Sequence, residues 1–229
     1  MPPTTPSPKP GPTPTPAPSG MRRWGPLFGA ACLLIALGFG AAAWLRRPAE
    51  APGFGSVAGE VTLPGGVNLG GPFTLVNQDG RTVTDRDYRG RWTLMTFGYT
   101  FCPDVCPTEL ATIASALDAL DPALAERVQP VFVSIDPARD TPEHLKQYVA
   151  LFHPRLVGLT GTPEQVAAAA RAYRVYYAKA RGQDTTEYLM DHSSFMYLIG
   201  PDGTVRALFQ PGVTPEQLAE ALRRRAAQS

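Results

Sequence analysis

Cys102 and Cys106 are the residues of this 229-residue chain best suited to chemistry, because they place two thiols four residues apart. They stand between an apolar run and a helix-like pattern, in a loop punctuated by prolines. Pro107 suits the first position of a helix, which predicts that Cys106 lies at or near the N-cap. Unpaired backbone N–H groups at a helix start favour an anion, so a thiolate forms there more easily.

Two chemistries suit such a pair. Four residues make about one helical turn, which brings two sulfurs close enough to bond each other or to bind one soft ion. This spacing is compatible with both dithiol exchange and metal binding. Two purely structural cysteines are the third interpretation, but thiols in a loop with prolines are poor core fillers. Cys102 and Cys106 are therefore candidates for a redox pair and for metal ligands.

His192 is the candidate third metal ligand. It leads directly into an expected strand over 195–199, and in a thioredoxin-like sheet the loop before that strand faces the cysteine loop. Thioredoxins carry a proline there, whereas this chain has a histidine. Of the other two histidines, we expect His144 to be a solvated helix residue and His153 to cap or pack a loop.

Two thiolates and one imidazole match copper better than zinc. Cu(I) prefers soft sulfur and tolerates few ligands. Zn²⁺ requires a fourth ligand, for which Asp104 and Asp191 are the candidate carboxylates. Asp191 could instead orient the imidazole, as metal-bound histidines commonly need, or cap its loop.

The elements that must position these residues alternate between strand and helix periods. A hairpin is predicted over 73–84 around Asn77–Gly80, and a second over 195–209 around Pro201–Gly203. Buried strands are predicted over 92–100, 128–135 and 156–159, and helices over 108–120, 141–151, 162–173 and 214–225. This order predicts an α/β fold, a thioredoxin-like mixed sheet flanked by helices with an added N-terminal hairpin. Phosphate-binding glycine loops and a nucleophile elbow are absent from the sequence.

The N-terminal part differs in composition from the rest. Nine of the first twenty residues are prolines, and 22 uncharged residues run from Trp24 to Leu45 between arginine pairs. We expect a disordered tail over 1–21, a single transmembrane anchor over 22–47, a linker over 48–70 and the folded domain over 71–229. Met21 is an alternative start, and Ala41–Ala43 offers a signal-peptide cleavage pattern as the alternative to an anchor. Cys32 is expected to be a small apolar residue of the span.

Charge gives no general case for nucleic-acid binding, because 21 basic and 20 acidic residues leave a net charge of +1. Arginines flank the apolar segment on both sides, which gives only a marginal orientation signal. A single N-terminal span usually delivers the rest of its chain to the outer side of the membrane. We therefore expect an inner (cytoplasmic) membrane protein with its soluble domain on the periplasmic or extracytoplasmic side.

Over roughly residues 70–227 the chain resembles the Sco/SenC family of copper-binding, thioredoxin-fold proteins that assist cytochrome c oxidase assembly. The matching segments are 99–107, 133–142, 158–163, 173–177 and 191–193, and the Cys-x-x-x-Cys loop with the downstream Asp-His-Ser is the most specific. The resemblance implies that Cys102, Cys106 and His192 bind one copper ion, as Cu(I) or Cu(II). It also implies oxidase subunit II as a partner, with other copper chaperones or thiol reductants as further ones.

The leading hypothesis is a membrane-anchored copper chaperone that assists assembly of the copper A centre. The alternative is a thiol–disulfide oxidoreductase that keeps partner cysteines reduced through Cys102 and Cys106. A weaker third hypothesis is a copper or redox sensor. A peroxidase is disfavoured because no arginine stands beside the cysteines in sequence. His192 discriminates the first two, since only copper retention requires an imidazole.

Overall fold

The computed structural model describes residues 59–61, 69–180 and 188–227, all within the compact unit Phe54–Ser229. The expected tail over 1–21 and the expected anchor over 22–47 lie outside the described residues, as does most of the expected linker over 48–70. Within the described part of the chain, no helix is both long and apolar enough to cross a membrane. The part of the linker that is described includes a short strand, β1, which the sequence pattern does not predict.

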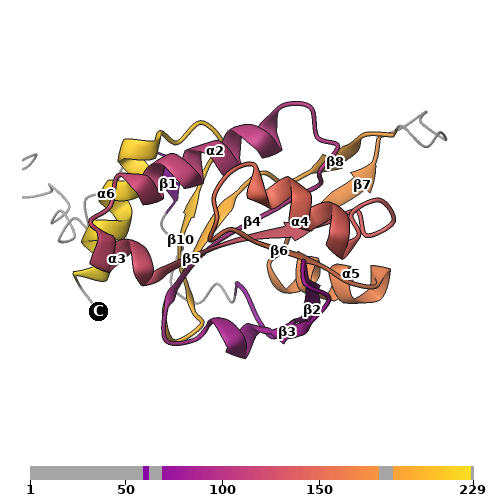
Figure 1. Ribbon diagram of the computed structural model, residues 1–229, viewed down its shortest axis with the longest axis horizontal. Coiled ribbons are helices and arrows are strands. Elements are labelled where there is room, and N and C mark those ends of the chain that lie inside the picture. The colour runs from indigo at the N-terminus through magenta and orange to yellow at the C-terminus, as the bar shows by residue number, and fades with distance from the viewer. Residues whose placement is uncertain (1–58, 62–68, 181–187, 228–229) are drawn as a thin grey trace, which may run out of the picture. The chain divides into compact units, whose positions relative to one another are not determined.

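A mixed sheet forms the centre of the described unit (Figure 1). Its eight strands lie in the order β1-β10-β9-β4-β5-β6-β2-β3. The pairs β4–β5 and β5–β6 are parallel, and the other neighbouring pairs are antiparallel. The strands are β1 (Glu60–Val61), β2 (Thr74–Asn77), β3 (Thr82–Thr84), β4 (Trp92–Gly98), β5 (Val128–Ser134), β6 (Val157–Thr160), β9 (Met196–Ile199) and β10 (Val205–Phe209).

The predicted N-terminal hairpin is confirmed and joins the sheet edge. β2 pairs with β3 and also with β6, so the hairpin extends the main sheet. A separate two-stranded sheet pairs β7 (Tyr177–Lys179) with β8 (Met190–His192). The sequence pattern does not predict this ribbon. Its strands have only three residues each, which is too short for a clear period-2 pattern.

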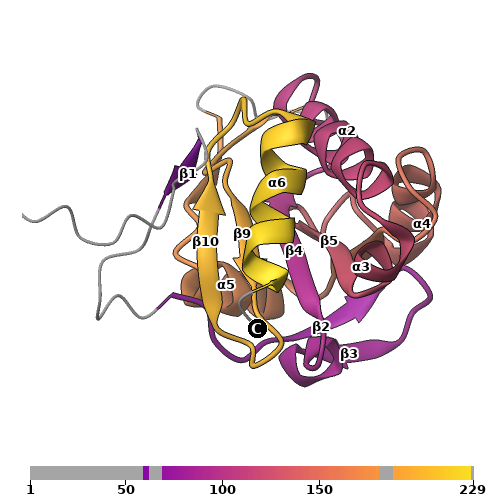
Figure 2. The same ribbon diagram turned by 90° about the vertical axis from the view of Figure 1, so that its left-hand side faces the viewer.

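The helices cover both faces of the sheet. They are α2 (Val105–Asp118), α3 (Pro122–Glu126), α4 (Pro142–Ala150), α5 (Pro163–Ala172) and α6 (Pro215–Ala226), with a short 3₁₀ helix, η1, at Asp85–Tyr88. Figure 2 shows α2 and α6 in front of the sheet and α5 behind it. Three of the predicted helix starts are confirmed, because Thr141, Thr162 and Thr214 each accept a backbone N–H and a proline follows each.

Alternation along the central strands separates two apolar cores. Leu94 of β4 and Phe132 of β5 pack with α2, α4 and α6 on one face. Met95 and Phe97 of β4 point to the other face, where they form the second core with residues of α5 and the two cysteines. Every residue of β4 is buried, which explains why this strand reads as a continuous apolar run.

The helix that follows the cysteine loop starts earlier than predicted. The expected range was 108–120, whereas α2 begins at Val105 with Asp104 as its N-cap. Pro107 therefore lies at the third helical position. A proline is tolerated throughout the first turn, because the N–H groups there have no partner inside the helix. Cys106, predicted at or near the N-cap, therefore lies in the first turn of α2, two residues after the N-cap.

Candidate metal centre

Cys102 and Cys106 lie at the point where β4 passes into α2. A turn closed by the Cys102 N–H on the Tyr99 carbonyl, at 3.2 Å, brings the chain from the strand into the loop. Both cysteines are free thiols and both are buried, Cys102 at 9% exposure and Cys106 at 2%. Cys102, just before the helix, is the more exposed of the two residues.

The helix start stabilises a thiolate on Cys102 rather than on Cys106, contrary to the prediction from sequence. The Cys106 S–H donates to the Cys102 sulfur, which is the largest influence and lowers the pKa of Cys102 to about 5. Burial opposes this, while the backbone N–H groups of Asp104 and Cys106 support it. The same shared proton, together with burial, raises the pKa of Cys106. One thiolate and one thiol therefore share the site before a metal binds.

His192 is the last residue of β8, where it pairs with Tyr177 of β7. His192 was expected in a loop, but it lies at the end of a strand in the β7–β8 ribbon, which was not predicted. The imidazole Nδ1 lies 3.0 Å from the Ser193 carbonyl, and Nε2 lies 3.5 Å from the Cys106 sulfur. A carbonyl accepts only, so Nδ1–H donates to it, and Nε2 is the ring nitrogen that faces the sulfur. The Ser193 carbonyl, and not the exposed Asp191 carboxylate, orients the ring.

The structure brings the three predicted donors together. The two sulfurs and one ring nitrogen of His192 all lie within 4.8 Å of one another. Among the described residues, no carboxylate belongs to this group, so neither Asp104 nor Asp191 completes a zinc site. A site of two buried sulfurs and one half-buried imidazole, whose ring is held by the Ser193 carbonyl, fits a soft ion of low coordination number such as Cu(I).

Glu109 lies one turn along α2 from Cys106 and is only 3% exposed. Thr96 donates to its Oε2 at 2.9 Å, while Oε1 has no hydrogen-bond partner among the described residues. Burial raises the pKa of Glu109 to about 6. Its negative charge opposes ionisation of Cys106 and favours a cation at the sulfurs.

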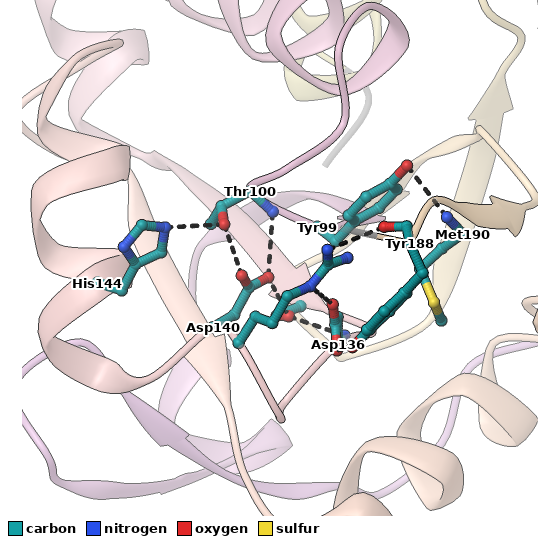
Figure 3. A network of polar contacts seen from close by, with 9 residues as sticks. Tyr99, Thr100, Asp136, Asp140, His144, Tyr188 and Met190 are labelled. Atoms are coloured by element: carbon teal, nitrogen blue, oxygen red, sulfur yellow. Dashed lines mark hydrogen bonds and ion pairs between the residues drawn. The ribbon is translucent and has the colours of Figure 1, made fainter. Parts of the chain in front are cut away.

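A polar network fixes the start of the cysteine loop (Figure 3). Asp140, fully buried, accepts the Thr100 N–H at 3.1 Å, the Thr100 hydroxyl at 2.6 Å and the Ser134 hydroxyl at 2.5 Å. Burial raises the pKa of Asp140, and these hydrogen bonds oppose the rise. The network ties the residue after Tyr99 to the end of β5, so the loop leaves the sheet in one direction.

The other two histidines do not join the metal donors. His144 is half-buried, with Nε2 2.9 Å from the Thr100 hydroxyl and its ring stacked on Phe101. The prediction of a solvated helix residue is therefore wrong, because its helix packs beside the cysteine loop. His153 accepts the Arg155 N–H at 3.1 Å, which confirms its expected role in a loop.

Sequence reasoning gave no role to Asp136, Arg139, Asp140 or Tyr188. The first three do carry a signal, since they follow the buried strand β5, directly beside the end of β4. Carboxyl ends of neighbouring parallel strands meet at one edge, where sites commonly form. Tyr188 carries no such signal, because it lies 49 residues from Arg139, its partner in a hydrogen bond.

A family model described as SCO1/SenC matches residues 62–227. The chain is 48% identical over 134 residues to Protein SCO1 homolog 1, mitochondrial, of Arabidopsis thaliana, and 51% identical over 136 residues to Protein SCO1 homolog, mitochondrial, of Homo sapiens. These matches cover 58% and 59% of this chain. They cover 40% and 45% of the two relatives, so the chain matches less than half the length of either.

Solved structures give the same likeness. The copper-bound ScoI of Arabidopsis thaliana is 41% identical, with a TM-score of 0.65, over 70% of this chain and 99% of that one. The copper-bound ScoI of Bradyrhizobium japonicum is 44% identical, with a TM-score of 0.63, over 68% and 98%. BsSco, described as a member of the Sco family of cytochrome c oxidase assembly proteins with a disulfide switch, is 25% identical, with a TM-score of 0.58, over 74% and 100%. These likenesses confirm the predicted mixed, thioredoxin-like fold of the described unit.

Proposed function

The chain belongs to the SCO1/SenC family, and we propose that it is a membrane-anchored copper chaperone. In this proposal Cys102, Cys106 and His192 bind one copper ion, and the protein assists assembly of the copper A centre in cytochrome c oxidase subunit II. The observation that carries the proposal is the group of two sulfurs and one imidazole nitrogen within 4.8 Å. Copper-bound relatives with the same fold support the choice of metal.

The residues divide the work of holding and releasing the ion. Cys102 offers a thiolate at neutral pH, because its pKa lies at about 5. Cys106 must lose its proton when the metal binds, and the cation itself drives this loss. His192 presents Nε2 while the Ser193 carbonyl holds the opposite side of the ring. A partner's thiolates can then replace these donors one at a time, so that copper is never released free.

The proposal extends to the part of the chain outside the described residues. The apolar segment within 22–47 anchors the protein in the inner (cytoplasmic) membrane, and the folded domain lies on the periplasmic or extracytoplasmic side. The length of that segment and the arginines at both ends support this placement. Subunit II is the proposed recipient, because the family likeness includes a protein described as belonging to the oxidase assembly proteins.

A second candidate function is reduction of a partner disulfide. The low pKa of Cys102 favours it, since the thiolate is the nucleophile in thiol–disulfide exchange. Cys102 would attack one sulfur of the partner disulfide and release the other as a thiolate. Cys106, after losing its proton, would attack the Cys102 sulfur and release the partner's second thiolate. The product is a Cys102–Cys106 disulfide, which a thiol reductant must reduce again.

Transfer assays with the soluble copper A domain of subunit II separate the two functions. The Cu(I)-loaded full-length protein is mixed with the reduced domain, and the reduced, metal-free protein is mixed with the disulfide form. We expect copper transfer from the parent chain and from His153→Gln, whose histidine lies outside the donor group. His192→Ala should load, and therefore deliver, less copper. Disulfide reduction by all three chains without copper transfer from any would replace the chaperone proposal with the reductase.

A further inference from the structure

We propose that Arg139 is a positioning residue that holds the strand carrying His192 against the loop carrying the cysteines. The inference rests on the proposed copper function and deepens it, because it assigns control of the third ligand to a residue that does not touch the metal. The cysteines and the histidine lie on separate parts of the fold. Cys102 and Cys106 are fixed by β4 and α2 of the main unit, whereas His192 lies on the separate ribbon β7–β8.

Arg139 is itself firmly anchored. It follows β5 in a turn closed by its own N–H on the Asp136 carbonyl, at 3.2 Å. Its Nε lies 2.5 Å from Asp136 Oδ2, and both side chains are largely buried, at 13% and 4% exposure. A buried ion pair with hydrogen-bond geometry is costly to break, so the guanidinium has one defined position.

From that position the guanidinium contacts Tyr188, in the segment that leads into β8. One terminal nitrogen donates to the Tyr188 carbonyl at 2.9 Å, and the group stacks 3.7 Å over the Tyr188 ring. The Tyr188 hydroxyl donates back to Asp136 Oδ1 at 2.6 Å. Backbone, ring and hydroxyl of one residue are therefore all held by the Asp136–Arg139 pair, four residues before His192.

The same guanidinium also contacts the cysteine loop. It lies 4.6 Å from the centre of the Phe101 ring and 5.7 Å from that of Tyr99. Phe101 directly precedes Cys102 and is 51% exposed, so the cation supports one face of a side chain that the core does not cover. Tyr99 adds a parallel link, since its hydroxyl accepts the Met190 N–H at 3.1 Å.

Two short strands alone are marginally stable in water, so the ribbon depends on such contacts to stay in place. Removing Arg139 releases Tyr188 and withdraws support from Phe101, while Asp140 and α2 still hold the cysteines. The expected result is a site that keeps two sulfur ligands and loses the contribution of His192.

The test compares Cu(I) affinity in Arg139→Met, Arg139→Lys, His192→Ala and the double variant Arg139→Met/His192→Ala. Loss of a group that orients a metal ligand typically weakens binding about 10- to 100-fold. We expect Arg139→Met to fall in this range and the double variant to bind no more weakly than His192→Ala alone. Arg139→Lys should recover part of the affinity, because lysine keeps the charge beside Asp136 but lacks the planar fork.

Arg224→Met is the matched control, since Arg224 is another partly buried arginine in an ion pair, with Glu60 on the edge strand β1. It should leave Cu(I) affinity unchanged. Electron paramagnetic resonance of the Cu(II)-loaded chains shows directly whether the nitrogen ligand remains. Additive losses in the double variant, or a nitrogen signal retained in Arg139→Met, would overturn the proposal.

A metal-free measurement separates this inference from the proposed function. Amide hydrogen exchange of the apo protein should speed up at Met190 in Arg139→Met and not in Arg224→Met. If the parent chain binds no copper, the proposed function fails, and exchange still tests the hold of Arg139 on β8. Unchanged exchange at Met190 in a folded Arg139→Met would contradict the inference whatever the copper result.

Discussion

At the scale of single residues, the two cysteines have different chemistry although they share one loop. Cys102 accepts hydrogen bonds from the Cys106 thiol and from two backbone N–H groups at the helix start. Cys106 lies deeper, beside the buried Glu109, and keeps its proton. We therefore expect the Cys102 sulfur to be the more reactive of the two, and the first to meet an ion in the proposed copper function.

Alkylation of the metal-free protein should reveal this asymmetry. Because the pKa of Cys102 lies at about 5, its thiolate is nearly complete at pH 7, and its reaction with iodoacetamide should fall by half near pH 5. Cys106 should react far more slowly, since burial and the shared proton raise its pKa. Peptide mapping by mass spectrometry separates both sites from Cys32.

The control is Cys106→Ala, which removes the S–H donor that most lowers the pKa of Cys102. Its midpoint for Cys102 should move upward, toward the usual value of about 8.5. Faster modification of Cys106, or a Cys102 midpoint near the usual value in the parent chain, would contradict the assignment.

The sequence indicated the three residues that the fold brings together, whereas it indicated no role for the residues around them. The Cys-x-x-x-Cys loop is a local pattern, and His192 is indicated by its place before an expected strand of a thioredoxin-like sheet. Arg139 and Tyr188 meet across 49 positions, and no local rule pairs them. The sequence left open which cysteine is the nucleophile, because this depends on hydrogen-bond directions that only the folded loop defines.

At the scale of elements, β4 ends in a glycine for a steric reason. A Cβ on Gly98 would lie 2.7 Å from the Cys106 sulfur and 2.9 Å from Cε2 of Phe132. Real Cβ contacts are longer than this, so any side chain must displace one of the two. The close approach of strand and sulfur is what lets α2 pack its first turn on the sheet.

Gly98→Ala should therefore displace the Cys106 sulfur, which packs against β4. We expect overpacking to cost about 1–3 kcal/mol of the free energy of unfolding and Cu(I) binding to weaken as Cys106 moves. Gly71→Ala is the matched control, since a Cβ there meets only Ala172 at 3.5 Å, an ordinary contact. Thermal unfolding and a copper titration measure the two effects. Equal behaviour of the two variants would show that Gly98 is not a steric requirement.

Most elements of the main sheet could be predicted, because buried strands and capped helices leave clear local signals. Proline after threonine marks three helix starts correctly. The ribbon β7–β8, the strand β1 and the short helix α3 could not be predicted. Each has five residues or fewer, and long-range partners rather than local periodicity stabilise it.

At the scale of the whole described unit, its N-terminal strand and C-terminal helix are joined by one buried carboxylate. Glu60 of β1 forms ion pairs with Arg224 and Arg225 of α6, the latter at 2.5 Å. Burial acts to raise the pKa of Glu60, but the two guanidinium groups hold it below its usual value. These ion pairs therefore connect β1, the first described strand, to α6, the last helix.

Glu60→Gln should destabilise the protein without affecting the proposed copper site. Removing the carboxylate charge leaves two partly buried arginine charges uncompensated, which should cost more than about 1 kcal/mol. Glu220→Gln, which breaks an exposed pair with Arg223 at 3.6 Å on the same helix, should cost less than about 1 kcal/mol. Denaturant unfolding measures both. Equal losses, or weaker Cu(I) binding in Glu60→Gln, would contradict this role.

The same ion pairs give a pH dependence with a defined sign. The folded pKa of Glu60 lies below its ordinary value of 4.5, so the carboxylate contributes its full stabilisation above that value. The contribution is lost as the pH falls through the folded pKa. The parent chain should therefore lose more stability than Glu60→Gln as the pH falls below about 4.5.

His192 is proposed to complete a copper site with Cys102 and Cys106, and a Cu(I) titration against a competing chelator is the measurement to make first. The reduced full-length chain and His192→Ala are titrated side by side, with His153→Gln as the histidine control. We predict one copper per chain, bound at least about tenfold more weakly by His192→Ala and with unchanged affinity by His153→Gln. No binding by the parent chain, or equal affinity with and without His192, would contradict it.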